Sequence, residues 1–368
     1  MVQRYTPEVE VGLAAMHEEY ESLLRDGRRW SLRSLFSTSD GDIADYCRSF
    51  RPNRFGAQAR AETERFCRRY DIWLEPGGDH YNSMTPYLHP NTITAERMTI
   101  IGIFNAILFW LNDRVGREKF GHLSALEQQQ ARDLVDRLCV LLDTQYAAEH
   151  LTPVEAATAE LLTMLRKDAD EAWFDRFLTA TIDHLRPAIR DQNARARDGL
   201  LGVEDYIALR VHVSGMYPAI ALCEFARDDY LPWDRLGAAG LAQQLHQLRL
   251  STAELGALMN DMFSFEKECI ADRADFNLIP ICLLNSPGAT LADAIDRAAQ
   301  IVRDRLGRFH RTRAALIRRC ATLPDAALAE SVVAHVDDLE RCVQATWVWQ
   351  HTTQRYKGLS IFTENLPS

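Results

Sequence analysis

Apolar residues recur at helical spacing along almost the whole chain, and no alternating strand pattern of useful length competes with them. Glycine and proline, at 18 and 13 of 368 residues, are used less than average, which argues against a turn-rich β-sandwich or barrel. We therefore predict an all-α fold, arranged as an antiparallel helical bundle. The expected helices cover residues 10–25, 41–50, 57–71, 95–112, 124–147, 153–166, 170–193, 203–227, 238–270, 290–319 and 325–356.

Length and composition favour a single domain over residues 1–368. The chain is 47% hydrophobic and 26% charged, which is enough to build a sizeable core. No Pro/Gly/Ser-rich linker divides it into two halves, and no repeat of solenoid period is visible. Loops are expected at 74–90, 231–240 and 285–289, where proline and glycine cluster.

Charge and cysteine content exclude several classes of partner. A net charge of −10 and a pI near 5.6 provide no basic footprint for nucleic acid or an anionic membrane. The eight cysteines are dispersed without a CxxC pair, so we expect them to be reduced and buried. The N-terminus lacks an apolar signal region, and the longest apolar stretch, 98–111, is shorter than the roughly 18 to 20 residues of a membrane span. These features predict a cytoplasmic protein without a membrane span.

The most informative window is 258–269. In a helix, Asn260, Ser264 and Glu268 recur at i, i+4 and i+8, and at about 100° per residue they line an arc of roughly 80°. An amide oxygen, a hydroxyl and a carboxylate form a hard-oxygen half-shell that suits Mg²⁺. A solvated polar face is the alternative, but the neighbouring residues are apolar on most sides, and buried polar groups need partners.

This window resembles the second metal-binding motif of class I terpene cyclases, which reads Asn260-Asp261-x-x-Ser264-x-x-Lys267-Glu268 here. The resemblance covers about 71–356, with 1–70 expected as N-terminal helices of the same domain. It implies a class I terpenoid synthase fold with the active site in a central cavity. It also implies that the three oxygen donors bind metal and that Lys267 binds diphosphate.

A candidate for the first metal-binding motif of that family follows the apolar helix. Asn112 and Asp113 come at the end of this helix, and Glu118 follows at the longer of the spacings that the family shows. Asn112 stands where the family has its first aspartate, and an amide is a neutral, weaker ligand. The resemblance implies Asp113 and Glu118 as metal ligands, with Asn112 as a further candidate. Alternatively, Asn112 and Asp113 merely terminate the helix.

Two further segments agree with the resemblance and imply diphosphate ligands. Arg355-Tyr356, preceded by Trp349, resembles the late Arg-Tyr pair that binds diphosphate in the family. Arg210 resembles the diphosphate-sensing arginine, with a helix break expected at Ser214 and Gly215.

Aromatic side chains are expected to shield a carbocation through cation–π attraction, worth about 2 kcal/mol or more for a desolvated cation. Phe109 and Trp349 are the favoured residues, and core packing is the alternative for every such aromatic. The remaining candidates are Phe104, Trp110 and Tyr87.

The resemblance implies an enzyme that ionises a linear prenyl diphosphate with three Mg²⁺ ions, for which Mn²⁺ can substitute, and cyclises the cation. Farnesyl diphosphate is preferred as substrate, and geranylgeranyl diphosphate is the second choice. The segments 114–124 and from 355 onward are expected to fold over bound diphosphate. One alternative is a non-catalytic isoprenoid-diphosphate binder disabled at Asn112, and another is a prenyl-chain elongating transferase. The sequence leaves a homodimer open.

Overall fold

The structure is a computed structural model that describes residues 3–4, 6–38, 41–75 and 77–367. It confirms the all-α prediction, because the only strands among these residues are two of two residues each. The elements are β1 (Gln3–Arg4), α1 (Pro7–Arg25), α2 (Leu32–Phe36), α3 (Ile43–Tyr46), α4 (Gly56–Arg69), α5 (Gly78–Asn82), α6 (Thr85–Leu88), α7 (Ala95–Val115), α8 (Arg117–Phe120), α9 (Ala125–Thr144), α10 (Pro153–Lys167), α11 (Glu171–Ala188), β2 (Gly199–Leu200), α12 (Val203–Val213), α13 (Met216–Arg227), α14 (Trp233–Ala238), α15 (Ala242–Phe265), a π-helix (Glu266–Ala271), α16 (Leu278–Leu284), α17 (Leu291–Cys320), α18 (Ala326–Thr352) and two 3₁₀ turns (Gln354–Tyr356, Thr363–Asn365).

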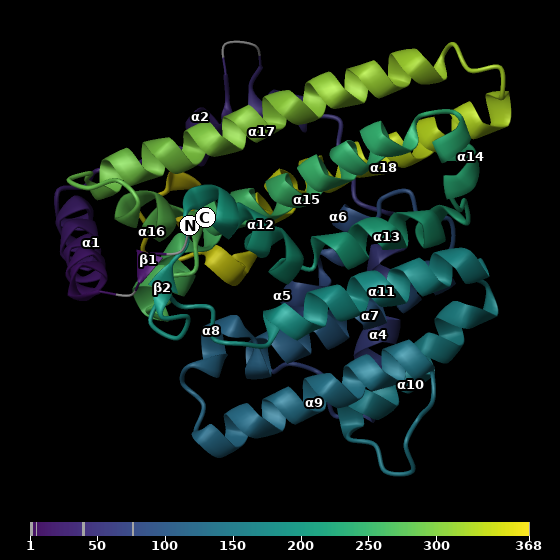
Figure 1. The fold of residues 1–368 in the computed structure, drawn as a ribbon, viewed down its shortest axis with the longest axis horizontal. Coiled ribbons are helices and arrows are strands. Elements are labelled where there is room, and N and C mark those ends of the chain that lie inside the picture. The colour runs from purple at the N-terminus through teal and green to yellow at the C-terminus, as the bar shows by residue number, and fades with distance from the viewer. Residues whose placement is uncertain (1–2, 5, 39–40, 76, 368) are drawn as a thin grey trace.

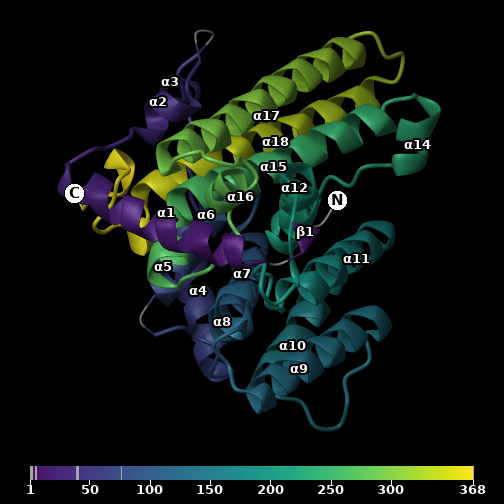
Figure 2. The same cartoon turned by 60° about the vertical axis from the view of Figure 1, so that its left-hand side comes forward.

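The helices form two packed groups that meet at α13. On one side α15 packs against α17 and α18, and on the other α7, α9, α10 and α11 pack together (Figure 1). Figure 2 shows the same separation from a second direction. Cys223 of α13 belongs to the first apolar core, and Leu222 and Phe225 of α13 belong to the second. Helix α13 therefore links the two cores.

Helix starts follow local capping chemistry. Thr94 caps α7 by accepting a hydrogen bond from the backbone N–H of Arg97. Ser124 with Glu127 caps α9 as a reciprocal capping box, and Thr290 does the same for α17. These caps stand directly before apolar periodic runs, which is why the predicted starts of these helices fall within a residue of those observed.

Two predicted long helices differ from the structure. The one expected over 203–227 is broken at Ser214 and Gly215, as the motif reading anticipated. Gly215 has a φ of 75°, a left-handed conformation that favours glycine, and α12 and α13 meet there at 45°. The one expected over 238–270 changes at Glu266 from an α-helix to a π-helix.

Two of the three loop predictions, which were based on clustered proline and glycine, were partly wrong. The expected loops at 74–90 and 231–240 contain the short helices α5, α6 and α14. In α6 Pro86 occupies the first turn, where a missing N–H costs nothing, so proline there starts a helix rather than breaking one. Pro280 likewise lies in the first turn of α16, a helix that the sequence analysis did not predict.

Helix α7 is the central apolar element. It is longer than the apolar stretch seen in the sequence, and its length and composition alone would allow it to cross a membrane. However, 56% of its most apolar window is buried inside the fold, as is usual for the core helix of a globular protein. All eight cysteines are free and buried, as predicted.

Candidate active site

A cavity opens between α7, the α12–α13 break, α15 and α18, and water-sized molecules can occupy about 170 Å³ of it. Its wall combines a polar cluster with an apolar surface. The polar lining includes Asn112, Arg117, Arg210, Asn260, Glu268, Gln350, Arg355 and Tyr356. The apolar lining includes Leu88, Leu108, Phe109, Met216, Ala219 and Trp349.

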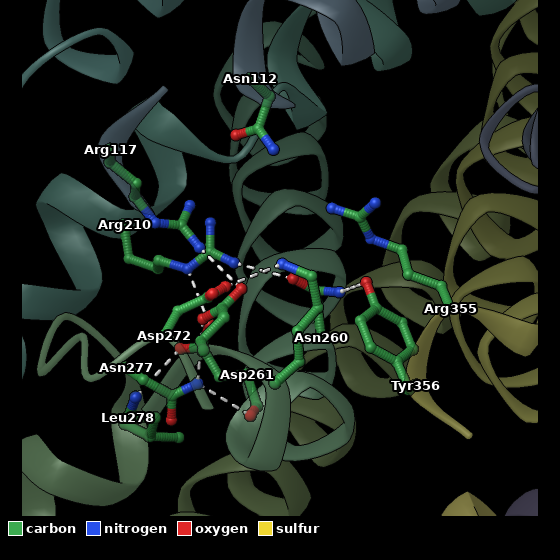
Figure 3. A network of polar contacts seen from close by, with 12 residues as sticks. Asn112, Arg117, Arg210, Asn260, Asp261, Asp272, Asn277, Leu278, Arg355 and Tyr356 are labelled. Carbon is green, nitrogen blue, oxygen red and sulfur yellow. Dashed lines mark hydrogen bonds and ion pairs between the residues drawn. The ribbon is translucent and has the colours of Figure 1, made fainter. Parts of the chain in front are cut away.

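Asn260 holds the centre of the polar cluster (Figure 3). Its Oδ1 accepts a hydrogen bond from Arg210 Nη2 at 3.0 Å. Its Nδ2 donates to Tyr356 Oη at 2.8 Å and to Gln350 Oε1 at 3.0 Å. Residues from three distant parts of the sequence therefore meet at one amide.

Arg210 is fixed by a buried ion pair with Asp261. Arg210 Nε lies 2.7 Å from Asp261 Oδ1, and the two side chains are 2% and 0% exposed. Burial opposes the charge on Arg210, but the negative charges of Asp261 and Glu268 and the hydrogen bond to Asp261 act together with Tyr206 to raise the pKa of the guanidinium. Tyr206 Oη and the Leu278 backbone N–H also donate to Asp261. The guanidinium therefore stays charged and rigidly placed.

Glu268, in the π-helix, faces the same cavity. Its Oε1 pairs with Arg117 Nη2 at 3.0 Å, and its Oε2 accepts a hydrogen bond from Asn277 Nδ2 at 3.3 Å. The sequence reading placed Glu268 on a continuous α-helix with Asn260, whereas the observed π-turn begins between them. Such π-turns are frequent at functional sites.

The first-motif residues lie in the last turn of α7. Asn112 lines the cavity and donates from Nδ2 to Asp113 Oδ1 at 3.1 Å. Arg355 Nη2 lies 3.3 Å from the same Asp113 oxygen. The helix continues to Val115, so these two residues do not end it. Glu118 lies in α8, and its side chain is outside the described part of the structure.

Aromatic rings surround Arg355. Its guanidinium carbon lies 4.4 Å from the centre of the Tyr81 ring and 5.8 Å from that of Phe109. Phe109 stacks on Tyr81 with ring centres 5.3 Å apart. Trp349 lines the cavity and donates from Nε1 to Ser83 Oγ at 2.9 Å. Phe109 and Trp349 are therefore both in the wall, as expected of them.

The chain after Tyr356 is docked on the π-helix. Ser360 Oγ and the Ile361 backbone N–H donate to Glu266 Oε1 at 2.6 and 3.1 Å. Burial raises the pKa of Glu266 to about 7, although these hydrogen bonds oppose the shift. The docking fixes the segment that carries Arg355 and Tyr356 beside the cavity.

Other predicted residues lie away from the cavity lining. Lys267 Nζ is 3.4 Å from Asp272 Oδ2, and Asp272 also pairs with Lys119. Phe104 packs on Phe177 in the second core. Trp110 and Tyr87 are likewise absent from the lining and pack against the apolar cores. Core packing, the alternative reading, describes these three aromatics.

Sequence reasoning missed Arg117, Tyr81 and the partner role of Asp261. Asp261 is part of the quoted motif, but the sequence does not indicate that it pairs with Arg210. Arg117 and Tyr81 carry no local pattern that sets them apart from surface residues. Only the fold brings Arg117 to the cavity and Tyr81 to Arg355.

The oxygen donors suit a hard divalent cation. Among the described residues, no group of three His, Cys, Asp or Glu side chains is placed to hold a metal, so a site here depends on amide and hydroxyl oxygens as well. Ser264 Oγ is buried and has no hydrogen-bond partner among those residues. A buried hydroxyl of this kind needs a partner. The oxygen donors of Asn260, Ser264 and Glu268 therefore fit a site for a hard divalent cation.

The chain resembles known proteins along most of its length. Residues 103–308 match the family model described as terpene synthase family 2, C-terminal metal binding. Pristinol synthase of Streptomyces pristinaespiralis is 24% identical over 286 residues, which are 75% of this chain and 72% of that relative. A (−)-beta-caryophyllene synthase of Saccharothrix espanaensis is 28% identical over 226 residues, 60% of this chain and 62% of the relative.

Solved structures share the fold. The crystal structure of a-eudesmol synthase matches with a TM-score of 0.68 at 19% identity, over 83% of this chain and 97% of that one. The T181N variant of cucumene synthase matches with a TM-score of 0.69 at 20% identity, over 84% of this chain and 98% of that one. Because the family model spans more than half of the chain, this protein belongs to terpene synthase family 2 and is an enzyme of the terpene synthase type.

Proposed function

We propose that this enzyme is a magnesium-dependent terpene cyclase that ionises farnesyl diphosphate and cyclises the resulting cation, releasing diphosphate. One observation carries the proposal: a single cavity has three arginines in its polar lining together with Asn112 of the first motif and Asn260 and Glu268 of the second, and aromatic and aliphatic side chains in the rest of its wall. A substrate with an anionic head and a hydrocarbon tail matches that division. We also infer one domain for the whole chain, since the first apolar core contains residues from both of its ends, Met16 and Phe362, and α13 links that core to the second.

The arginines and Tyr356 would bind the departing diphosphate. Arg210 and Arg355 present guanidinium forks, which match phosphate oxygens bidentately, and Tyr356 Oη lies beside them on Asn260. Lys267 lies near the predicted ligands, and we assign it a diphosphate contact that requires it to leave Asp272.

Asn260, Ser264 and Glu268 would hold one ion, and Asp113 would bind on the opposite motif together with Glu118 or Asn112. When bound, Mg²⁺ supplies Lewis acidity that stabilises the charge of the leaving group. The residues of this chain position the head group, keep their own charges in place and exclude water from the tail.

Phe109 and Trp349 would shield the carbocation. Both lie in the cavity wall, and a ring face attracts a desolvated cation by about 2 kcal/mol or more. The Trp349 indole N–H is occupied by Ser83, which fixes the plane of the ring. A fixed ring can guide folding of the chain as well as exclude water.

The fifteen-carbon substrate is favoured by relatives. The Saccharothrix relative is named as cyclising (2E,6E)-farnesyl diphosphate, and three relatives from Postia placenta are named sesquiterpene synthases. A Streptomyces cyslabdanicus relative is named (12E)-labda-8(17),12,14-triene synthase, which keeps geranylgeranyl diphosphate as the second choice.

The test is incubation of the purified protein with ten-, fifteen- and twenty-carbon prenyl diphosphates, with Mg²⁺ or with chelator, followed by gas chromatography and mass spectrometry of the extract. A cyclic product from the fifteen-carbon chain that needs Mg²⁺ is expected. A parallel incubation also contains isopentenyl diphosphate. Formation of a longer prenyl diphosphate in that incubation would instead identify an elongating transferase. Substrate binding without any product would identify a non-catalytic binder.

A further inference from the structure

Arg117 joins the two motifs across the cavity. It begins α8, and its Nη2 lies 3.0 Å from Glu268 Oε1 although the two residues are 151 positions apart. Both side chains are buried, at 8% and 5% exposure, and both line the cavity. Glu268 of the second motif thus forms an ion pair with the guanidinium of Arg117, which lies in the segment that carries the first motif.

Gly116 makes this placement possible. A Cβ at this position would lie 2.4 Å from the carbonyl oxygen of Asn112, so only glycine fits the turn that ends α7. After that turn α8 packs back against α7. Arg117 is therefore delivered to the cavity by the same turn that presents Asn112.

Two of the three cavity arginines, Arg210 and Arg117, differ in the carboxylate that holds them. Arg210 is locked on Asp261, a fully buried residue that is not in the cavity lining and has further donors in Tyr206 and Leu278. Arg117 instead rests on Glu268, a carboxylate that lines the cavity and that we assign to metal binding. Its ion pair can therefore be exchanged by a change at the site itself.

The reduced negative charge at the first motif explains what the Arg117 guanidinium can contribute there. Asn112 is neutral where the resembled motif has a carboxylate, so the end of α7 carries one negative charge fewer opposite the incoming diphosphate. A guanidinium in the same turn adds positive charge where a metal ligand is weakest. Its planar fork also matches two phosphate oxygens, which a carboxamide cannot do.

We propose that Arg117 is a diphosphate-binding residue that rests on Glu268 until a divalent ion takes that carboxylate. The proposal rests on the proposed function of the site. Guanidinium and metal compete for the same carboxylate oxygens, so the arrival of the metal releases Arg117 toward the diphosphate. Arg117 therefore weakens metal binding when diphosphate is absent and strengthens diphosphate binding when metal is present.

The test measures two binding equilibria without turnover. Mn²⁺ is titrated into the protein alone and followed by electron paramagnetic resonance, and inorganic diphosphate is titrated calorimetrically in saturating Mg²⁺. For Arg117→Gln we expect Mn²⁺ affinity to rise about tenfold, because the Glu268 carboxylate loses the positive charge that competes with the metal. We expect diphosphate affinity to fall roughly tenfold, because a charge-assisted bidentate contact is lost.

Arg114→Gln is the matched control, since Arg114 lies in the same segment but is exposed. It should change both affinities less than twofold or so. Arg117→Lys keeps the charge without the fork, so smaller shifts in the same two directions are expected. If Arg117→Gln does not fold, as judged by circular dichroism, the lysine variant decides.

Unchanged or weaker Mn²⁺ binding, or unchanged diphosphate binding, in a folded Arg117 variant overturns the proposal. In that case Arg117 only holds Glu268 in position. The proposed function is then still supported if the wild-type protein binds Mn²⁺ and diphosphate. A wild-type protein that binds neither Mn²⁺ nor diphosphate refutes the proposed function itself. The two failures are distinguished because the first appears only in the variants.

Discussion

The amide nitrogen of Asn260 donates to the phenolic oxygen of Tyr356 at 2.8 Å, which joins two residues 96 positions apart in the sequence. Asn260 lies on α15 in the second motif, and Tyr356 follows α18 in the late Arg-Tyr pair. Since Arg210 donates to the oxygen of the same amide, one side chain connects three predicted functional segments. Truncating Asn260 would therefore remove a proposed metal ligand and, at the same time, the link between the proposed diphosphate contacts Arg210 and Tyr356.

Asn260→Ala should therefore lower product formation roughly 100-fold or more, because it removes a proposed direct ligand of the metal. Tyr356→Phe should have a smaller effect, roughly tenfold, since it deletes one hydroxyl. Gas chromatography of timed incubations measures both rates. Gln243→Ala, at an exposed position of the same helix, is the control and should keep the wild-type rate. Wild-type turnover in Asn260→Ala would remove this residue from the site.

Asn112→Asp tests the weakened first motif. A carboxylate in place of the amide adds a charged oxygen ligand at a cavity-lining position, so the Mg²⁺ concentration for half-maximal product formation should fall. A decrease of about threefold to tenfold is the expected size for one added ligand charge. The measurement is product formation over a Mg²⁺ titration. An unchanged titration would mean that Asp113 already performs the whole role.

Asp261→Asn should destabilise the fold. The substitution leaves the buried Arg210 guanidinium without its counter-charge, and breaking such a pair costs about 3–5 kcal/mol. Urea unfolding followed by circular dichroism measures the loss. The control is Asp175→Asn, at an exposed position of α11, which should change the free energy of unfolding by less than about 0.5 kcal/mol. Equal stability of the two variants would contradict a buried ion pair at Asp261.

The sequence predicted those parts of the fold and site whose causes are local. Helix α17 begins one residue after Thr290, because a capping threonine stands directly before an amphipathic run. Asn260 and Glu268 were placed in one site because their spacing along a helix is itself a distance in space. The break at Gly215 was also local, since it depends on the conformational freedom of one residue.

The rest could not be predicted because it depends on contacts between distant segments. Glu268 meets Arg117 only after the turn at Gly116 and the packing of α8 bring them together, and neither residue signals the other in the sequence. Lys267 was assigned to diphosphate from its place in the motif, yet the π-helix and Asp272 direct its amine to an ion pair. No periodicity rule anticipates a π-turn inside an otherwise regular apolar run.

Acid should destabilise the protein through His89. This side chain is 2% exposed, its Nε2 has no partner among the described residues, and burial lowers its pKa to about 3. The unfolded chain therefore takes up the proton near pH 6.5 while the folded chain does not. Stability from this group is complete above pH 6.5 and falls by about 1.4 kcal/mol per pH unit until about pH 3.

His89→Leu removes this contribution, so its free energy of unfolding should fall less steeply than that of the wild type between pH 7 and pH 5. Urea unfolding at both pH values gives the difference, expected to be about 2 kcal/mol. His150→Gln, in the exposed loop between α9 and α10, serves as the control and should follow the wild type. Parallel pH profiles for His89→Leu and the wild type would show that His89 is protonated in the folded protein.

Leu108 separates the cavity from a second, smaller apolar space. It lines both the cavity and a void of about 20 Å³ between α7, α9, α10 and α11. Leu108→Ala removes three carbon atoms from this wall and extends the apolar part of the cavity toward the void. If the wild-type enzyme uses the fifteen-carbon substrate, the variant should gain on the twenty-carbon substrate.

The expected change is roughly tenfold in the ratio of kcat/KM between the two substrates, the discrimination that a few methylene groups provide in an apolar pocket. Leu111→Ala is the matched control, because Leu111 lines the void but not the cavity. It creates a similar loss of core packing without opening the wall, so it should leave the substrate ratio unchanged. An equal shift in both variants would show that general loosening of α7, rather than the boundary at Leu108, sets the length of chain accepted.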